Sequence, residues 1–442
     1  MADSVELIRA STRLHIREVE TGANSLGDGR GSHLRTLLLH GVKQFDRTFV
    51  QIDRELDAVT SGEMDDGVRA KLRATVAQKF ERLGVQLHLA YTLLNTFSAS
   101  IGRADVPIGL QHLLGTVLSE LVSEPSDPIV HPNPIRMYST KDLVDRLDEL
   151  LLPYRGSKLS DGYAGPHPIV FNLPALDPSN ALLSPIIAHE VGHTAVERKL
   201  RADLRARVDA DVQAILSKHL ASAGSAVSGP LADTWANLFR QWCSELICDA
   251  VALVSAGPAF MLAFASFAQP TASPTVGTHP PVRDRIALHL RILDELGWSE
   301  VMDEHLPKVR DWLVEMSTDV ISTGTPLEAF LREAMDRAAD DISAIAREHG
   351  AHPLDPATTA TILPSLVGFV RDGVPNVEFD GITASPWQII LAGWIAAVDS
   401  GANPGVQLIE VVADRGLSDL LIKSVELSSI VTNWRTIERA RT

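Results

Sequence analysis

Apolar residues recur at intervals of three and four along most of the chain, a spacing that gathers side chains on one face of a helix. The clearest runs cover residues 33–59 and 65–98. The first run carries Leu37, Leu38, Val42, Phe45, Phe49, Ile52 and Leu56 at this spacing. We therefore predict two long amphipathic helices that pack as an antiparallel pair.

The same periodicity predicts shorter helices over residues 111–122 and 140–152. The Gly-rich composition of segment 21–32 predicts a loop. The segment lacks both the dinucleotide fingerprint and the phosphate-loop pattern, so it gives no indication of nucleotide binding. After residue 300 the helical pattern continues without a recognisable chemical constellation. These patterns predict an N-terminal helical domain (1–150), a central domain (151–300) and a C-terminal helical domain (301–442).

A change of composition at Pro153 marks the central domain, where Gly, Pro, Asp and Ser become frequent. Residues 167–174 then form the run HPIVFNLP, whose β-branched and aromatic centre bounded by prolines predicts a short edge strand. Such an edge can hold an extended peptide through main-chain hydrogen bonds, although an ordinary structural strand is the alternative. The expected fold is therefore mainly α, in the α+β class, with a small edge sheet.

Residues 250–268 form a stretch of 19 residues without a charge, which is long enough for a membrane span. Gly257 and Pro258 interrupt it and no Lys or Arg flanks it closely, so a buried pair of short helices is favoured. A second apolar segment, residues 387–398, is too short to cross a bilayer. Ser385 and Pro386 before it are typical of an N-cap and a first helical position.

Composition narrows the classes of function. The formal net charge of −16 and the pI of about 5.4 disfavour a nucleic-acid partner, because phosphate binding rests on Lys and Arg. The two cysteines, Cys243 and Cys248, lie on different faces of one predicted helix and cannot form a disulfide framework. No apolar run of signal-peptide length occurs in residues 1–20. We expect a cytoplasmic protein without a membrane partner.

The pattern His-Glu-x-x-His occurs at His189, Glu190 and His193. On a helix, histidines four residues apart project from one face and can bind a single metal ion, most commonly zinc. Zinc in a catalytic site raises the acidity of a water molecule, and Glu190 is placed to take up that proton. Gly192, which has no side chain, would let a second element approach the ligand face.

Two carboxylates follow in the next predicted helix. Glu245 and Asp249 are four residues apart on an otherwise apolar helix, where unpaired carboxylates are costly to bury. A metal explains both: Glu245 as the third ligand, and Asp249 as the acceptor for the outer ring nitrogen of a ligating histidine. A solvated patch is the alternative for the pair. Cys248 could compete as a soft ligand, but a buried inert thiol is favoured.

A third segment, Thr278-His279-Pro280-Pro281, opens a further predicted helix. His279, held in a turn by two prolines, is placed to point into a cleft. There it could donate a hydrogen bond to the oxyanion that forms when a peptide carbonyl is attacked. By itself His279 would indicate no more than a capping residue.

In combination, AHEVGH, SELICDA and THPPVRDRI resemble the gluzincin zinc endopeptidases, in particular the group of the HtpX heat-shock peptidases and the CAAX-prenyl endopeptidases. The similarity covers about residues 168–290 and implies a zincin-type core with one zinc ion per chain. The resemblance implies zinc ligands His189, His193 and Glu245, general base Glu190, supporting residue Asp249, and substrate or oxyanion contacts His279 and Arg285. The membrane helices usual in that group are missing, and the metzincin pattern fails at Val196 and Lys199.

The expected function is a zinc-dependent peptidase acting on a peptide or protein substrate through a water molecule activated by Glu190. Two alternatives remain open at this point. The first is a non-catalytic, zinc-stabilised interaction protein, against which the presence of Glu190 counts. The second is a latent regulatory protease that cleaves a single partner protein. The sequence does not indicate the oligomeric state.

Overall fold

The computed structural model describes residues 4–26, 32–98, 107–121, 126–133, 139–145, 147–148, 162–165, 167–174, 180–195, 201–222, 229–267, 279–318, 325–349, 354–375, 377–398 and 403–441. They belong to two compact units, the first formed by Met1–Asp105 and Glu124–Leu176, the second by Val106–Ser123 and Asp177–Thr442. Helices make up most of the described residues of both units, and the strands form only two small sheets. The predicted mainly α fold with a small sheet is confirmed.

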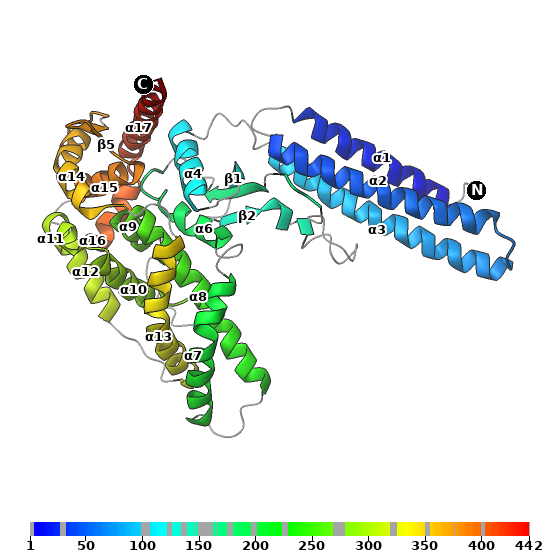
Figure 1. Cartoon of the computed structure of the whole chain (residues 1–442), viewed down its shortest axis with the longest axis horizontal. Helices are drawn as coiled ribbons and strands as arrows, with labels where there is room; N and C mark the ends of the chain where they lie inside the picture. Colours follow the sequence, from blue (N-terminus) through cyan, green and yellow to red (C-terminus); the bar gives the residue numbers. More distant parts are fainter. Residues whose placement is uncertain are drawn as a thin grey trace. The chain divides into compact units, whose positions relative to one another are not determined.

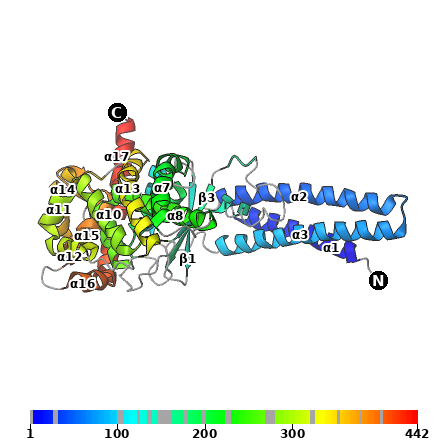
Figure 2. The same cartoon turned by 90° about the horizontal axis from the view of Figure 1, so that it is seen from below.

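Three long helices form most of the first unit: α1 (Ser4–Ser25), α2 (Ser32–Ser61) and α3 (Asp66–Ser98). Figures 1 and 2 show them lying alongside one another, with α2 and α3 antiparallel. The apolar face of α2 is buried in the core of this bundle, as its spacing predicts, with Leu37, Phe45 and Leu56 at most 2% exposed. The two predicted helices are therefore confirmed.

Helix α1 corrects the prediction of a loop over residues 21–32. The helix continues to Ser25, and α2 already begins at Ser32. Ala23 is fully buried in the same core as Val19, so the packing of a third helix outweighs the loop preference of the glycines. Residues 27–31 lie outside the described part of the chain.

A three-stranded sheet completes the first unit: β1 (Ser126–Asn133), β2 (Ser139–Asp142) and β3 (His167–Pro174). Strand β3 lies in the centre, parallel to β1 and antiparallel to β2. The prediction of an edge strand over residues 167–174 is therefore wrong, because both sides of β3 are already paired and its prolines fall near its ends. Strand β2 also takes the start of the helix predicted over 140–152, of which residues 143–145 and 147–148 are helical.

The second unit consists of helices and one short hairpin. Its helices are α4 (Ile108–Leu121), α6 (Ile186–Ala195), α7 (Arg201–Ser222), α8 (Gly229–Ala256), α9 (Pro258–Phe267), α10 (Val282–Glu295), α11 (Ser299–His305), α12 (Pro307–Thr318), α13 (Pro326–His349), α14 (Pro356–Arg371), α15 (Pro386–Ala397), α16 (Pro404–Val412) and α17 (Arg415–Arg441). The hairpin joins β4 (Glu378–Phe379) to β5 (Ile382–Thr383). Figure 1 shows α13 beside α7 and α8, and these contacts place segments before and after residue 300 in one unit.

This division differs from the three predicted segments, and the packing of α13 gives the physical reason. Phe330 of α13 is fully buried, and its ring contacts Trp235 and Phe239 of α8, with centroids 5.9 and 6.1 Å apart. Aromatic contacts of this kind add to the stabilisation from apolar burial. The predicted central and C-terminal segments therefore share one core.

The uncharged stretch that begins at Ala250 forms the end of α8 and all of α9. The left-handed backbone of Gly257, with φ of +56°, separates the two helices. All residues from Ala250 to Ser266 are buried, which confirms the predicted pair of short core helices. No described helix is both long and apolar enough to cross a membrane. The predicted cap of α15 is also confirmed, because Ser385 and Gln388 form a reciprocal capping box.

Candidate metal centre

Helix α6 carries His189, Glu190, Gly192 and His193 within ten residues. The turn before it is fixed by Asn180, whose side-chain carbonyl accepts a hydrogen bond from the backbone N–H of Leu183. The two histidine rings lie 4.9 Å apart between centroids and almost perpendicular to each other. The four-residue spacing therefore places both imidazoles on one face of α6, as the sequence predicts.

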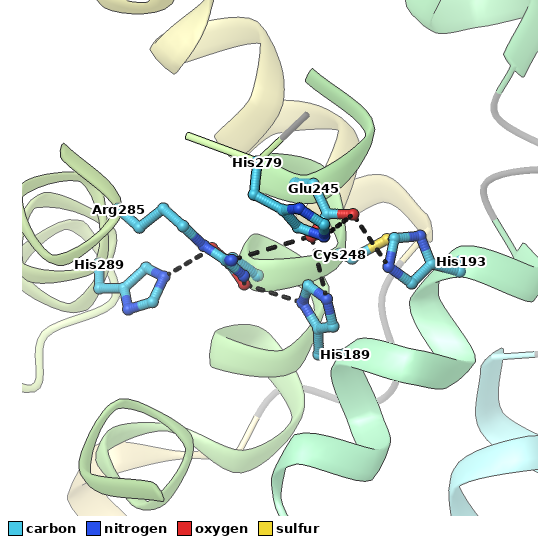
Figure 3. A network of polar contacts seen from close by, with 8 residues as sticks. His189, His193, Glu245, Cys248, His279, Arg285 and His289 are labelled. Atoms are coloured by element: carbon cyan, nitrogen blue, oxygen red, sulfur yellow. Dashed lines mark hydrogen bonds and ion pairs between the residues drawn. The ribbon is translucent and has the colours of Figure 1, made fainter. Parts of the chain in front are cut away.

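Glu245 of α8 faces both histidines, and Figure 3 shows its carboxylate between the two rings. One oxygen, Oε2, lies 3.5 Å from Nε2 of His189, and the other, Oε1, lies 3.4 Å from Nε2 of His193. Each of the three residues offers a ligand atom, and these atoms lie within 4.8 Å of one another. The group could therefore hold a metal ion.

The distance between Glu245 and each histidine can be compared with the spacing of ligands around a tetrahedral ion. Imidazole nitrogens and carboxylate oxygens bind zinc at about 2.1 Å, so two such ligands of a tetrahedral ion lie ~3.4 Å apart. The observed separations of 3.5 and 3.4 Å, each measured from a different oxygen of Glu245, are both close to this value. Within the described part of the chain the group has three members, and His193 leaves 29% of its side chain exposed. Three ligands with an accessible side are typical of a catalytic site, whereas structural sites are closed by a fourth ligand.

Asp249, one turn after Glu245 on α8, is completely buried and lies behind the ligands. Its Oδ1 is 2.8 Å from Nδ1 of His189. Because Nδ1 faces this carboxylate, Nε2 is the nitrogen that His189 presents to Glu245. The structure thus brings Asp249 to the outer nitrogen of a candidate ligand, the place that the sequence predicts for it.

Helix α10 supplies the counter-charge for Asp249. Arg285 donates two hydrogen bonds to it, from Nε at 2.7 Å and from Nη2 at 2.6 Å. The guanidinium also stacks on the ring of Phe264, 4.4 Å from the centroid. This bidentate geometry fixes the carboxylate and leaves the Arg285 side chain only 9% exposed.

His289 is a member of the network that the sequence does not single out. It is fully buried, its Nε2 lies 2.9 Å from Oδ2 of Asp249, and its ring contacts Phe260 and Phe264. A signal was present, because His289 follows Arg285 by four residues on a predicted helix and must share its face. In Figure 3, Arg285 and His289 approach together on the side away from His193.

His279 is an exposed member of the predicted set, whereas Glu190 is half-buried. His279 lies just before α10, with 62% of its side chain exposed and its Nε2 3.5 Å from Oε1 of Glu245. Glu190 is half-buried on α6, and its negative charge acts on His189. The structure therefore brings all seven predicted site residues together in the second unit.

Electrostatics favour a cation in this group. Burial lowers the pKa of His189, but Asp249, Glu245 and Glu190 outweigh burial and raise it to about 9. Burial would raise the pKa of Glu245, but His189 and the other nearby positive groups lower it to about 2. Burial and the charge of His189 lower the pKa of His193 to about 4. A bound ion would take the place of the proton on His189, because a ligating imidazole must be neutral.

Cys248 is close to this cluster without being one of its ligand residues. Its Sγ lies 3.4 Å from Nδ1 of His193, the nitrogen that faces away from Glu245. Burial raises the pKa of the Cys248 thiol well above its ordinary value, whereas binding zinc through sulfur requires a thiolate. The favoured interpretation of Cys248 as a buried neutral thiol agrees with this geometry.

Gly192 lets α6 approach α8 closely. A Cβ added at this position would lie 3.0 Å from Cα and 3.1 Å from Cβ of Cys248. We expect Gly192→Ala to force the two helices apart by a few tenths of an ångström, lowering zinc affinity and costing about 1–3 kcal/mol of stability. Chelator competition and urea unfolding measure the two effects. Unchanged zinc affinity would show that the separation of α6 and α8 does not control the ligand geometry.

Comparison of the chain with protein-family models, with curated proteins and with solved structures returned no match. The chemistry of the site is therefore inferred from its own residues. Their placement fits a possible zinc site of the His-Glu-x-x-His type with Glu245 as the third member.

Proposed function

We propose that the chain is a zinc-dependent peptidase whose ligands are His189, His193 and Glu245. The observation that supports this most strongly is the three-membered donor set, in which His193 is partly exposed, with Glu190 on the same helix as both histidines. Imidazole and carboxylate donors in this number suit zinc, although other divalent ions share the preference for imidazole. A bound zinc ion would acidify a water molecule and polarise the scissile carbonyl.

Two residues of the chain carry out the proton transfer and stabilise the oxyanion in this proposal. Glu190 accepts a proton from the attacking water and passes it to the amine that leaves when the C–N bond breaks. His279, exposed beside Glu245, donates a hydrogen bond to the oxyanion that develops on the carbonyl oxygen. Water is consumed, and one acid and one amine are released.

Arg285 has a different role in this proposal from the predicted substrate contact. Its Nε and Nη2 already donate to Asp249, and its remaining nitrogen, Nη1, lies 3.8 Å from Glu245. We assign Arg285 as a positioning residue that fixes Asp249, which in turn orients His189. The rival of a non-catalytic interaction protein accounts for neither the accessible side of the cluster nor a carboxylate in the position of a general base.

The test is mass-spectrometric detection of cleavage in a diverse peptide mixture. Three samples are compared: zinc-loaded protein, the same protein after chelation, and chelated protein returned to zinc. We expect cuts in the first and third samples, and the residues around them would define the specificity. Cuts that survive chelation would contradict metal dependence. The absence of cuts in all samples would contradict a general peptidase and favour a protease of a single partner.

A further inference from the structure

The two candidate histidine ligands are supported by different chemical groups. The outer nitrogen of His189 faces the carboxylate of Asp249 at 2.8 Å, whereas the outer nitrogen of His193 faces the thiol of Cys248 at 3.4 Å. Cys248 and Asp249 are consecutive on α8, so one turn of this helix supports both rings. Figure 3 shows the sulfur of Cys248 beside the ring of His193.

The contact between His193 and Cys248 is specifically accommodated by the fold. Cys248 is completely buried, and the missing side chain of Gly192 leaves the room in which its sulfur reaches the ring. A Cβ at residue 192 would lie 3.3 Å from this sulfur, in addition to its contacts with the backbone of α8. The absence of a side chain at Gly192 therefore allows the thiol of Cys248 to contact the ring of His193.

We propose that Cys248 is a positioning residue of the metal centre: its Sγ accepts a hydrogen bond from Nδ1 of His193, which leaves Nε2 of that ring to bind the ion. The inference rests on the proposed metal centre but not on peptidase activity. A histidine ligand that binds through Nε2 carries its proton on Nδ1, and a group that accepts this proton fixes both the tautomer and the angle of the ring.

The kind of acceptor matters for the strength of the site. Sulfur of a neutral thiol accepts a hydrogen bond weakly, whereas a carboxylate accepts strongly and makes the imidazole a more basic ligand. His193 is also the more exposed ligand, at 29% of its side chain against 8% for His189. His193 is therefore the more weakly supported ligand. We expect the loss of Cys248 to change the orientation of its ring.

The chain offers a matched control for testing this role. Cys243 lies on the same helix and is 1% exposed. Cys243→Ala therefore removes a buried thiol of the same size as the one that Cys248→Ala removes. Zinc affinity is measured by chelator competition on parent, Cys248→Ala, Cys248→Ser and Cys243→Ala, after circular dichroism shows that each is folded. The visible absorption spectrum of the cobalt-loaded proteins reports the ligand geometry independently of activity.

We expect Cys248→Ala to weaken zinc binding by about 10-fold, at the low end of the effect of losing a partner of a metal ligand because the thiol is a weak acceptor, and to change the cobalt spectrum. Cys248→Ser, which keeps an acceptor, should stay within a few-fold of the parent, and Cys243→Ala should match it. Equal affinities for both alanine variants would overturn the inference, whether both are unchanged or both weakened. If Cys248→Ala does not fold, a cobalt spectrum of Cys248→Ser identical to that of a metal-free sample would overturn it. A parent that binds zinc without cleaving peptides would contradict the proposed function alone.

Discussion

Replacing Glu190 with glutamine is expected to lower peptide turnover by about two to four orders of magnitude while zinc remains bound. The amide keeps the size of the side chain on α6 but cannot take a proton from water. The three ligand residues are unchanged, so the metal content should not fall. The measurement is kcat/KM on a peptide found in the cleavage mixture, together with zinc content by mass spectrometry.

The zinc content of the variant distinguishes a catalytic role of Glu190 from a structural one. Loss of turnover together with loss of zinc would mean that Glu190 supports the metal centre rather than the proton transfer. Turnover within about threefold of the parent would contradict the assignment of Glu190 as general base, because removing a positioned base costs far more than this.

Replacing Asp249 with alanine is expected to destabilise the second unit by about 3–5 kcal/mol, because it removes both hydrogen bonds of the buried Arg285 and leaves Glu245, 3.8 Å away, to balance its charge. Burial would raise the pKa of Asp249, but Arg285, His289 and His189 hold it well below its usual range. The carboxylate is therefore ionised at neutral pH, and its stabilising contribution is lost only as the pH falls below its unfolded pKa of about 3.9. Urea unfolding at neutral pH measures the loss.

An exposed pair between the same residue types gives the control. Asp209 and Arg240 join α7 to α8 at 3.1 Å, with side chains 40% and 36% exposed. Asp209→Ala should cost at most about 1 kcal/mol, as exposed ion pairs do. The double variant Asp249→Leu with Arg285→Leu should be less destabilised than the sum of the single losses, since it removes both buried charges. A loss below about 1 kcal/mol for Asp249→Ala would contradict the network.

Four members of the site could be predicted because their chemistry depends on short helical spacings. His189 and His193, and likewise Glu245 and Asp249, are four residues apart, and this alone places each pair on one face. The close approach of the two helices was also predictable from Gly192, whose missing side chain is where Cys248 packs. These inferences need no knowledge of the tertiary fold.

Contacts between segments that are far apart in the chain could not be predicted from the sequence. The central position of β3 depends on β1 and β2, whose sequences SDPIVHPN and STKD carry little strand propensity of their own. The helical end of α1 depends on the burial of Ala23 in a three-helix core. The helical spacing from Arg285 predicts that His289 shares its face of the helix. The contact of His289 with Asp249 is known only from the structure.

The hairpin of β4 and β5 carries a local signal in its own turn. Asp380-Gly381 separates the two strands, and both residues adopt positive φ, at 49° and 78°. This dipeptide is the preferred sequence of a two-residue hairpin turn, because Gly adopts that conformation without strain and Asp tolerates it. The hairpin could therefore have been predicted from the sequence.

The zinc content of the purified chain, compared with that of Glu245→Ala, tests the central claim most directly, because the proposed function and the role of Cys248 both require the metal centre. Both proteins are loaded with zinc, dialysed against metal-free buffer, shown to be folded by circular dichroism, and analysed by mass spectrometry. The geometry of His189, His193 and Glu245 predicts one zinc ion per parent chain and far less than one in the variant. Equal zinc content in the two proteins would contradict a metal centre formed by these three residues.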